Sequence, residues 1–196
     1  MGYCVSALFT PEMDGRTILH RWRYHIGRGF VEPGDVVVDV GSGTGYGTEM
    51  ISRVAGRVTG IEMVEAEVKG AREAFKSNPN IEFICADLEK IDFPECDVAV
   101  AFEVFEHMYH PDIFVKKMLK KVKKWIVFSV PLRQELEWDE GRKEYHERGD
   151  HTHKTVFFDS TAVLKFFDHP DWKPFSGYCE GVNFLSSFYN INQFKK

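Results

Sequence analysis

One run of nine residues carries the clearest chemical signal in this chain. Asp39-Val40-Gly41-Ser42-Gly43-Thr44-Gly45-Tyr46-Gly47 begins within a β-branched stretch, 36–40, that is typical of a buried strand. Glycines directly after such a strand allow a tight turn and let the backbone approach a ligand closely. Tyr46 occupies the place of the third glycine in the dinucleotide fingerprint GxGxxG. The acid Asp39 in the preceding strand suits a ligand with an amino-acid moiety and a sulfonium better than a pyrophosphate.

Two further acids come at the ends of the next two expected strands. Glu62 follows the strand 58–61, where a carboxylate can accept hydrogen bonds from both hydroxyls of a ribose, as found in NAD and in S-adenosylmethionine (SAM). Asp87 follows the strand 81–85 and is placed to accept a hydrogen bond from an adenine amino group. Since parallel strands end at one edge of a sheet, we expect the glycine loop and both acids to line one crevice.

Strand-like and helix-like segments alternate from residue 36 onward. The alternation predicts a three-layer α/β fold in which a parallel sheet with right-handed crossovers has helices on both faces. The expected strands are 36–40, 58–61, 81–85, 97–102 and 125–130, and the expected helices are 46–55, 64–75 and one that begins at Pro111.

Both ends of the chain differ in character from this central part. We interpret residues 1–30 as an N-terminal lid segment and the polar residues 132–155 as an insertion near the acceptor side of the crevice. A final helix is expected at 160–167. The segment 172–190 is expected to form a terminal hairpin that turns at Glu180-Gly181.

Length and composition predict one globular domain, 1–196. The 196 residues are 43% hydrophobic and 28% charged, which is ordinary for a soluble fold. The net charge of −5 argues against a non-specific nucleic-acid clamp, so a nucleic-acid partner is not favoured. Neither a long apolar run nor a signal peptide is recognised, and we expect a cytoplasmic protein without a membrane partner. The sequence does not predict the oligomeric state.

Taken together, these features resemble the class I SAM-dependent methyltransferases. The resemblance covers roughly residues 21–167 and is most specific in the glycine loop, where Ser42 replaces the Cys or Ala of many members. It implies a Rossmann-like, seven-stranded sheet of order 3-2-1-4-5-7-6 with strand 7 antiparallel, and it implies SAM as the cofactor. The cofactor-binding residues expected from it are Asp39, Gly41, Ser42, Gly43, Tyr46, Glu62, Met63, Asp87, Leu88, Phe102, Glu103 and Tyr24.

The residues after the fourth expected strand are candidates for the chemical step. Glu103, Glu106 and His107 are spaced i, i+3 and i+4, so a helical turn would place them on one face over the crevice. Methyl transfer requires alignment and the removal of a proton from a hydroxyl or amine, and His107 has a suitable intrinsic pKa. We expect these three residues to be catalytic. The alternative is a histidine that is only hydrogen-bonded near a helix start.

A metal site is an alternative use of the same side chains. Two carboxylates and an imidazole make a partial shell for a divalent cation, with His153 as the preferred fourth ligand. This arrangement is similar to RNA 3′-terminal 2′-O-methyltransferases and metal-assisted ubiquinone-pathway O-methyltransferases. Many small-molecule methyltransferases carry a similar segment without a metal, so our first interpretation includes no metal.

The leading interpretation is therefore methyl transfer from SAM to an oxygen or nitrogen of a small molecule or glycan. The alternatives are a metal-assisted RNA 2′-O-methyltransferase, a SAM-binding module without catalysis, and an NAD-dependent Rossmann oxidoreductase. Tyr46 argues against the oxidoreductase, and the intact glycine loop argues against the module.

Overall fold

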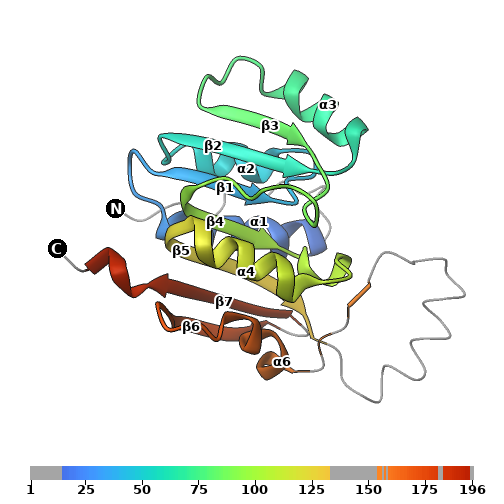
Figure 1. The fold of residues 1–196 in the computed structure, drawn as a ribbon. Helices are drawn as coiled ribbons and strands as arrows, with labels where there is room; N and C mark the ends of the chain where they lie inside the picture. The colour runs from blue at the N-terminus through green and yellow to red at the C-terminus, as the bar shows by residue number, and fades with distance from the viewer. Residues whose placement is uncertain (1–14, 133–153, 156, 158, 181–182, 195–196) are drawn as a thin grey trace, which may run out of the picture.

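The computed structural model describes residues 15–132, 154–155, 157, 159–180 and 183–194. These residues form one seven-stranded sheet with helices packed against it (Figure 1). The elements in chain order are α1 (Gly15–Gly27), η2 (Arg28–Phe30), β1 (Val36–Val40), α2 (Tyr46–Ser52), β2 (Arg57–Glu62), α3 (Glu65–Ala74), β3 (Ile81–Cys85), β4 (Cys96–Phe102), η3 (Phe105–His107), α4 (Pro111–Lys121), β5 (Val122–Pro131), α6 (Ser160–Leu164), η4 (Lys165–Phe167), β6 (Trp172–Glu180), β7 (Asn183–Asn190) and η5 (Ile191–Phe194).

The strand order is β3-β2-β1-β4-β5-β7-β6, as the resemblance implied. Strands β1 to β5 are parallel to one another, whereas β7 is antiparallel to both of its neighbours, β5 and β6. The strand order reverses between β1 and β4, which lie side by side. In open α/β sheets, ligands bind outside the carboxyl ends of the strands at such a point.

The core lies on both faces of the sheet, so the central strands are buried on both sides. In β1, Val38 and Val40 belong to the apolar cluster that includes α4 and α6. Val37 belongs instead to the cluster that includes α1 and α2, on the opposite face (Figure 1). Asp39 is the exception in this strand, because a carboxylate is fully buried between apolar neighbours.

Several element boundaries differ from the sequence predictions. β5 begins at Val122 rather than at 125, because Val122 pairs with Cys96 across an irregularity in the β4–β5 register. The second helix ends at Ser52 rather than at 55. The last helix is α-helical only as far as Leu164 and continues as a 3₁₀ turn to Phe167.

The segments expected at the periphery are described only in part. Of the lid segment 1–30, residues 15–30 form α1 and η2, and 1–14 lie outside the described residues. Most of the insertion 132–155, including His153, also lies outside them. The hairpin 172–190 is present as β6 and β7. In the described part of the chain, no helix is long and apolar enough to span a membrane.

Candidate cofactor and acceptor site

The glycine loop joins β1 to α2 and is tied to β2 by its backbone. The amides of Gly41 and Ser42 both donate to the carbonyl oxygen of Ile61, at 2.8 and 3.1 Å. Gly41, Gly43 and Gly45 all have positive φ angles, of 69°, 50° and 82°, which other residues rarely adopt. The loop therefore holds a conformation that its glycines make accessible.

The glycines of this loop differ in the space that surrounds them. A Cβ atom at Gly41 would lie 2.8 Å from Cγ2 of Val104, and one at Gly45 would lie 2.6 Å from the ring of Phe83. A Cβ atom at Gly43 would meet no heavy atom of the described residues within 4 Å. Gly43 is thus the point at which a ligand can approach the backbone of the loop.

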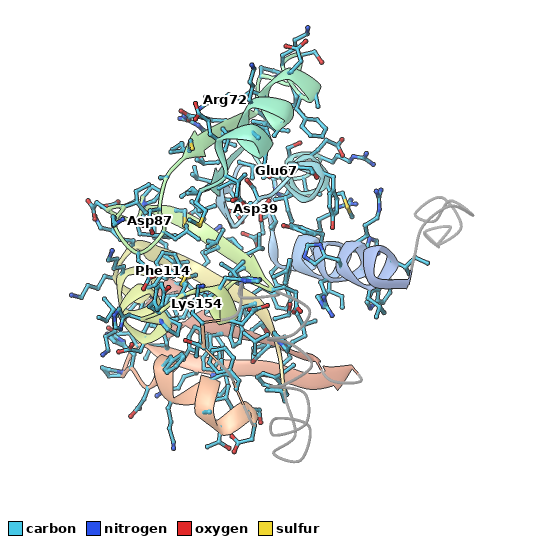
Figure 2. The ribbon with its side chains drawn as sticks, turned by 90° about the vertical axis from the view of Figure 1, so that its right-hand side faces the viewer. Asp39, Glu67, Arg72, Asp87, Phe114 and Lys154 are labelled. Atoms are coloured by element: carbon cyan, nitrogen blue, oxygen red, sulfur yellow. The ribbon has the colours of Figure 1, made fainter. Side chains whose placement is uncertain are left out.

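Asp39 lies below the loop with both carboxylate oxygens hydrogen-bonded. Its Oδ1 accepts from the hydroxyl of Tyr24 at 2.9 Å, and its Oδ2 accepts from the hydroxyl of Thr48 at 2.6 Å. The pKa of Asp39 is raised to about 7, mainly by burial and also by the charge of Glu62, although the two hydrogen bonds act to lower it. Figure 2 views the strand ends and shows Asp39 between α3 and α1.

Helix α1 covers the loop through direct packing. The ring of Tyr24 lies so close to Gly47 that a Cβ atom there would be 2.0 Å from it. His20 hydrogen-bonds through Nδ1 to the hydroxyl of Tyr46, and its Nε2 lies 3.5 Å from the carbonyl oxygen of Phe102. Phe102 itself is buried against Tyr24, with ring centroids 4.9 Å apart.

Glu62 ends β2 and bridges to the loop. Its Oε2 accepts from the amide of Gly43 at 3.1 Å, and its Oε1 accepts from the amides of Met63 and Val64 at 2.8 and 2.9 Å. Two carboxylate oxygens together offer about four acceptor positions, so this carboxylate can accept a further hydrogen bond. The side chain of Met63 is 67% exposed beside it, available to cover a flat ring.

Asp87 follows the end of β3 and is fixed by its own turn. Oδ1 accepts from the amide of Glu89 at 3.0 Å, and Oδ2 lies 2.9 Å from Nζ of Lys90. The hydrogen bond from Lys90 is the main reason that the pKa of Asp87 is lowered. Leu88 beside it is half-buried. Figure 2 shows Asp87 to the left of Asp39.

Glu103 follows β4 in an unusual backbone conformation. Its φ of 57° is the only positive φ of a non-glycine residue in the described chain, and such strain is concentrated at functional positions. Its Oε1 accepts from the hydroxyl of Ser129 at 2.7 Å and lies 3.7 Å from a guanidinium nitrogen of the buried Arg23. The side chain is therefore held by β5 and α1 together.

The expected common face of Glu103, Glu106 and His107 is not formed, since Glu106 is 1% exposed whereas the side chain of His107 is 43% exposed. The reason is that the chain turns at Glu103 and only Phe105–His107 follow as a 3₁₀ turn. Oε1 of Glu106 nevertheless lies 3.9 Å from Nε2 of His107. Burial, and then the charge of Glu103, raise the pKa of Glu106 to about 8.

Within the described residues, no three His, Cys, Asp or Glu side chains are grouped so that they could hold a metal ion. The set of Glu103, Glu106 and His107 is thus not brought together as a metal shell. His153, the fourth candidate ligand, lies outside the described residues.

Three polar residues of the site were missed by sequence reasoning. His20, Thr48 and Ser129 contact Tyr46, Asp39 and Glu103, respectively. The signal for Ser129 is a hydroxyl in an otherwise apolar buried strand, because a buried hydroxyl requires a hydrogen-bond partner.

The fold and the site define a Rossmann-like domain with a glycine loop after β1, a buried acid within β1, an acid at the end of β2 and another acid after β3. Residues 38–126 match the family model described as "Methyltransferase domain". A "Probable S-adenosylmethionine-dependent methyltransferase" of Mycolicibacterium smegmatis is 31% identical over 108 residues, which are 54% of this chain and 41% of that protein.

Two further curated relatives differ in the acceptor that their names indicate. A "Probable ribosomal RNA small subunit methyltransferase A" of Methanosarcina acetivorans is 29% identical over 68% of this chain and 48% of its own length. A "Ubiquinone biosynthesis O-methyltransferase" of Bradyrhizobium diazoefficiens is 33% identical over 44% of this chain and 35% of its own length. The chain spans less than half the length of these three relatives.

A solved structure shows the same fold. The N-methyltransferase NodS of Bradyrhizobium japonicum, in complex with S-adenosylhomocysteine (SAH), superposes with a TM-score of 0.69 at 15% identity, covering 95% of this chain and 96% of that chain. Residues 38–126 are thus similar to a methyltransferase domain, and the fold of the chain is shared with this solved structure.

Proposed function

We propose that this chain binds SAM and transfers its methyl group to an oxygen or nitrogen atom of a small molecule or glycan. The observation that carries the proposal is the placement of two acids at one glycine loop, with a third acid after the next strand of the sheet. Asp39 lies under the loop, Glu62 accepts from the amide of Gly43, and Asp87 follows the neighbouring strand. The family model and the names of the curated relatives support the same activity.

The residues at the glycine loop fit SAM in their hydrogen-bonding capacity and in the open space beside Gly43. The open side of Gly43 gives a ligand access to the loop backbone. Glu62 has acceptor capacity left for ribose hydroxyls, and Asp87, whose pKa is lowered, is an ionised acceptor suited to an amino group. Asp39 supplies negative charge close to the loop for a cationic group.

SAM would supply an electrophilic methyl carbon, and the chain's own side chains would align the acceptor and take up its proton. Glu106 can gain or release a proton near neutral pH, because burial places its pKa at about 8. Oε1 of Glu106 lies 3.9 Å from Nε2 of the exposed His107, which offers the proton a route to solvent. Glu103 accepts a hydrogen bond from Ser129 and so anchors the chain just before the turn that carries Glu106 and His107.

The charge of the chain supports a small or neutral acceptor over a polyanion. The net charge is −5, and the buried cation nearest the acceptor residues, Arg23, lies against Glu103. Binding to RNA draws its affinity from unneutralised Lys and Arg side chains facing phosphates. The pKa of the buried Glu106 is raised to about 8, so this residue offers a phosphate backbone no positive charge at neutral pH.

The test is transfer of a labelled methyl group from SAM by the full chain. Four acceptor classes are offered separately: a catechol, a primary alkylamine, an amino-sugar oligosaccharide and a small-subunit ribosomal RNA transcript. We expect label to be transferred to one of the first three. Transfer to RNA alone would overturn the proposed acceptor class. If the chain bound neither SAM nor SAH, the proposed methyltransferase activity would be overturned.

A further inference from the structure

Thr48 lies in the first turn of α2 and is fully buried beside Asp39. A helical threonine commonly donates its hydroxyl to the carbonyl one turn back along its own helix. Thr48 instead donates across to β1, at 2.6 Å from Oδ2 of Asp39. This hydrogen bond is the shorter of the two that reach the Asp39 carboxylate, because that from Tyr24 measures 2.9 Å.

We propose that Thr48 is a positioning residue for the cofactor, whose hydroxyl fixes the Asp39 carboxylate under the glycine loop and keeps it negatively charged. The inference rests on the proposed function, because it assumes that the ligand of the loop is SAM. Thr48 has no contact with the ligand in this proposal. It acts only through Asp39.

The geometry gives Thr48 a task that packing alone would not require. The two Asp39 oxygens each accept from one hydroxyl, and the two donors come from different helices, Tyr24 from α1 and Thr48 from α2. Two fixed donors on opposite oxygens define the plane of the carboxylate. Replacing either donor by an apolar group would leave one buried oxygen without a partner, which is costly.

The charge state of Asp39 also depends on Thr48. Burial favours the neutral form of Asp39, and the hydrogen bond from Thr48 is the largest influence that opposes it. The titratable groups that act on Asp39 are Tyr24 from α1, Tyr46 at the start of α2 and Glu62 from β2. Both tyrosine pKa values are raised, so the tyrosines are neutral, and only Glu62 adds a charge, which is of the same sign.

Loss of the Thr48 hydroxyl should therefore leave Asp39 largely protonated at neutral pH and reduce its attraction for a cation. The test uses Thr48→Val, which removes the donor, and Thr48→Ser, which keeps it. Calorimetry on the full chain measures Kd for SAM and for SAH at about pH 7 and about pH 9. We expect Thr48→Val to weaken SAM binding about tenfold at pH 7 and less at pH 9, where Asp39 ionises again.

Three matched comparisons make the result decisive. Thr48→Ser should bind SAM as the wild type does, and Tyr24→Phe should reproduce a weaker form of the Thr48→Val effect while keeping the ring on Gly47. SAH has no sulfonium charge, so its Kd should change less than that of SAM.

An unchanged Kd in Thr48→Val would overturn the proposal, as would a loss equal at both pH values and not rescued by serine. If Thr48→Val does not fold, the Kd of Tyr24→Phe for SAM at the two pH values tests the proposal instead, and a Kd that is unchanged from the wild type would overturn it. If the wild type binds neither SAM nor SAH, it is the proposed function that fails.

Discussion

Glu62 accepts a hydrogen bond at 3.1 Å from the backbone amide of Gly43, so the acid at the end of β2 is joined directly to the open point of the glycine loop. The sheet makes this contact possible. β1 and β2 are parallel neighbours in which Val40 pairs with Ile61. The glycine loop, which follows Val40, and Glu62, which follows Ile61, therefore begin next to each other. A ligand at Gly43 therefore lies beside a carboxylate from its first contact with the loop.

Replacement of Glu62 by glutamine should weaken SAH binding at least tenfold, because a hydrogen bond to a charged group contributes about 1.5–3 kcal/mol. Calorimetry at neutral pH measures the change. Glu82→Gln is the matched control, since Glu82 is exposed on β3 and pairs with Arg57 instead. Equal Kd values for the two variants would show that Glu62 does not contact the ligand.

The burial of Glu106 predicts an unusual dependence of stability on pH. Its pKa is about 8 in the folded chain against 4.5 for an unperturbed glutamate, so the folded state binds one more proton than the unfolded state between these values. The free energy of unfolding therefore falls as pH rises through this range, by up to about 1.4 kcal/mol per pH unit. Asp39, with a pKa raised to about 7, adds to the same trend between about pH 4 and 7.

Glu106→Gln removes the first of these two contributions because glutamine does not titrate. Urea unfolding at about pH 6 and about pH 9 should show a smaller loss of stability in the variant than in the wild type. Asp39 contributes equally to both proteins and cancels in the comparison. A variant with the same pH dependence as the wild type would contradict the buried position of Glu106.

Ser42 and Ser129 offer a matched pair of buried hydroxyls. Among the described residues, Oγ of Ser42 has no hydrogen-bond partner, whereas Oγ of Ser129 donates to Glu103 at 2.7 Å. Ser42→Ala should raise the free energy of unfolding by about 1 kcal/mol, and Ser129→Ala should lower it by about 1–3 kcal/mol. Urea midpoints measure both, and a loss of stability in Ser42→Ala would show that its hydroxyl is satisfied.

Two helical glycines should respond to alanine in opposite ways. A Cβ atom at Gly47 would overlap the ring of Tyr24, so Gly47→Ala should displace α1 and destabilise the chain by about 2 kcal/mol or more. Gly70 in α3 has no heavy atom near its Cβ position, and Gly70→Ala should stabilise by about 0.5–1 kcal/mol. Equal stabilities for the two variants would mean that α1 does not pack on Gly47 in solution.

The alternation of strands and helices and the glycine loop could be predicted because their signals are local or repeated, whereas the strand order was expected only from the resemblance to a known family. Ile81–Cys85 has the predicted bounds, and the loop's positive φ angles fall on glycines. The lengths of β5 and of the second helix could not be predicted, since their ends depend on pairing with Cys96 and on a turn after Ser52. Such ends are set by neighbours that are distant in the sequence.

The positions of the acidic residues of the candidate site could be predicted from the sequence, but their hydrogen-bond partners and their exposure could not. The positions of Asp39 within β1, Glu62 at the end of β2 and Asp87 after β3 follow from the alternation of elements. The opposite exposure of Glu106 and His107 does not, because it depends on a single residue, Glu103, adopting a left-handed conformation. The partners of Asp39 come from two different helices, and no spacing rule brings Tyr24 and Thr48 together.

Titration of the full chain with SAH and, separately, with NADH tests the central claim most directly. SAH should bind with one site per chain and with a Kd in the micromolar range, which Gly41→Arg should abolish by placing a side chain against Val104 and the loop. NADH should give no binding heat. Binding of NADH together with no response to SAH would contradict the assignment of the glycine loop to SAM.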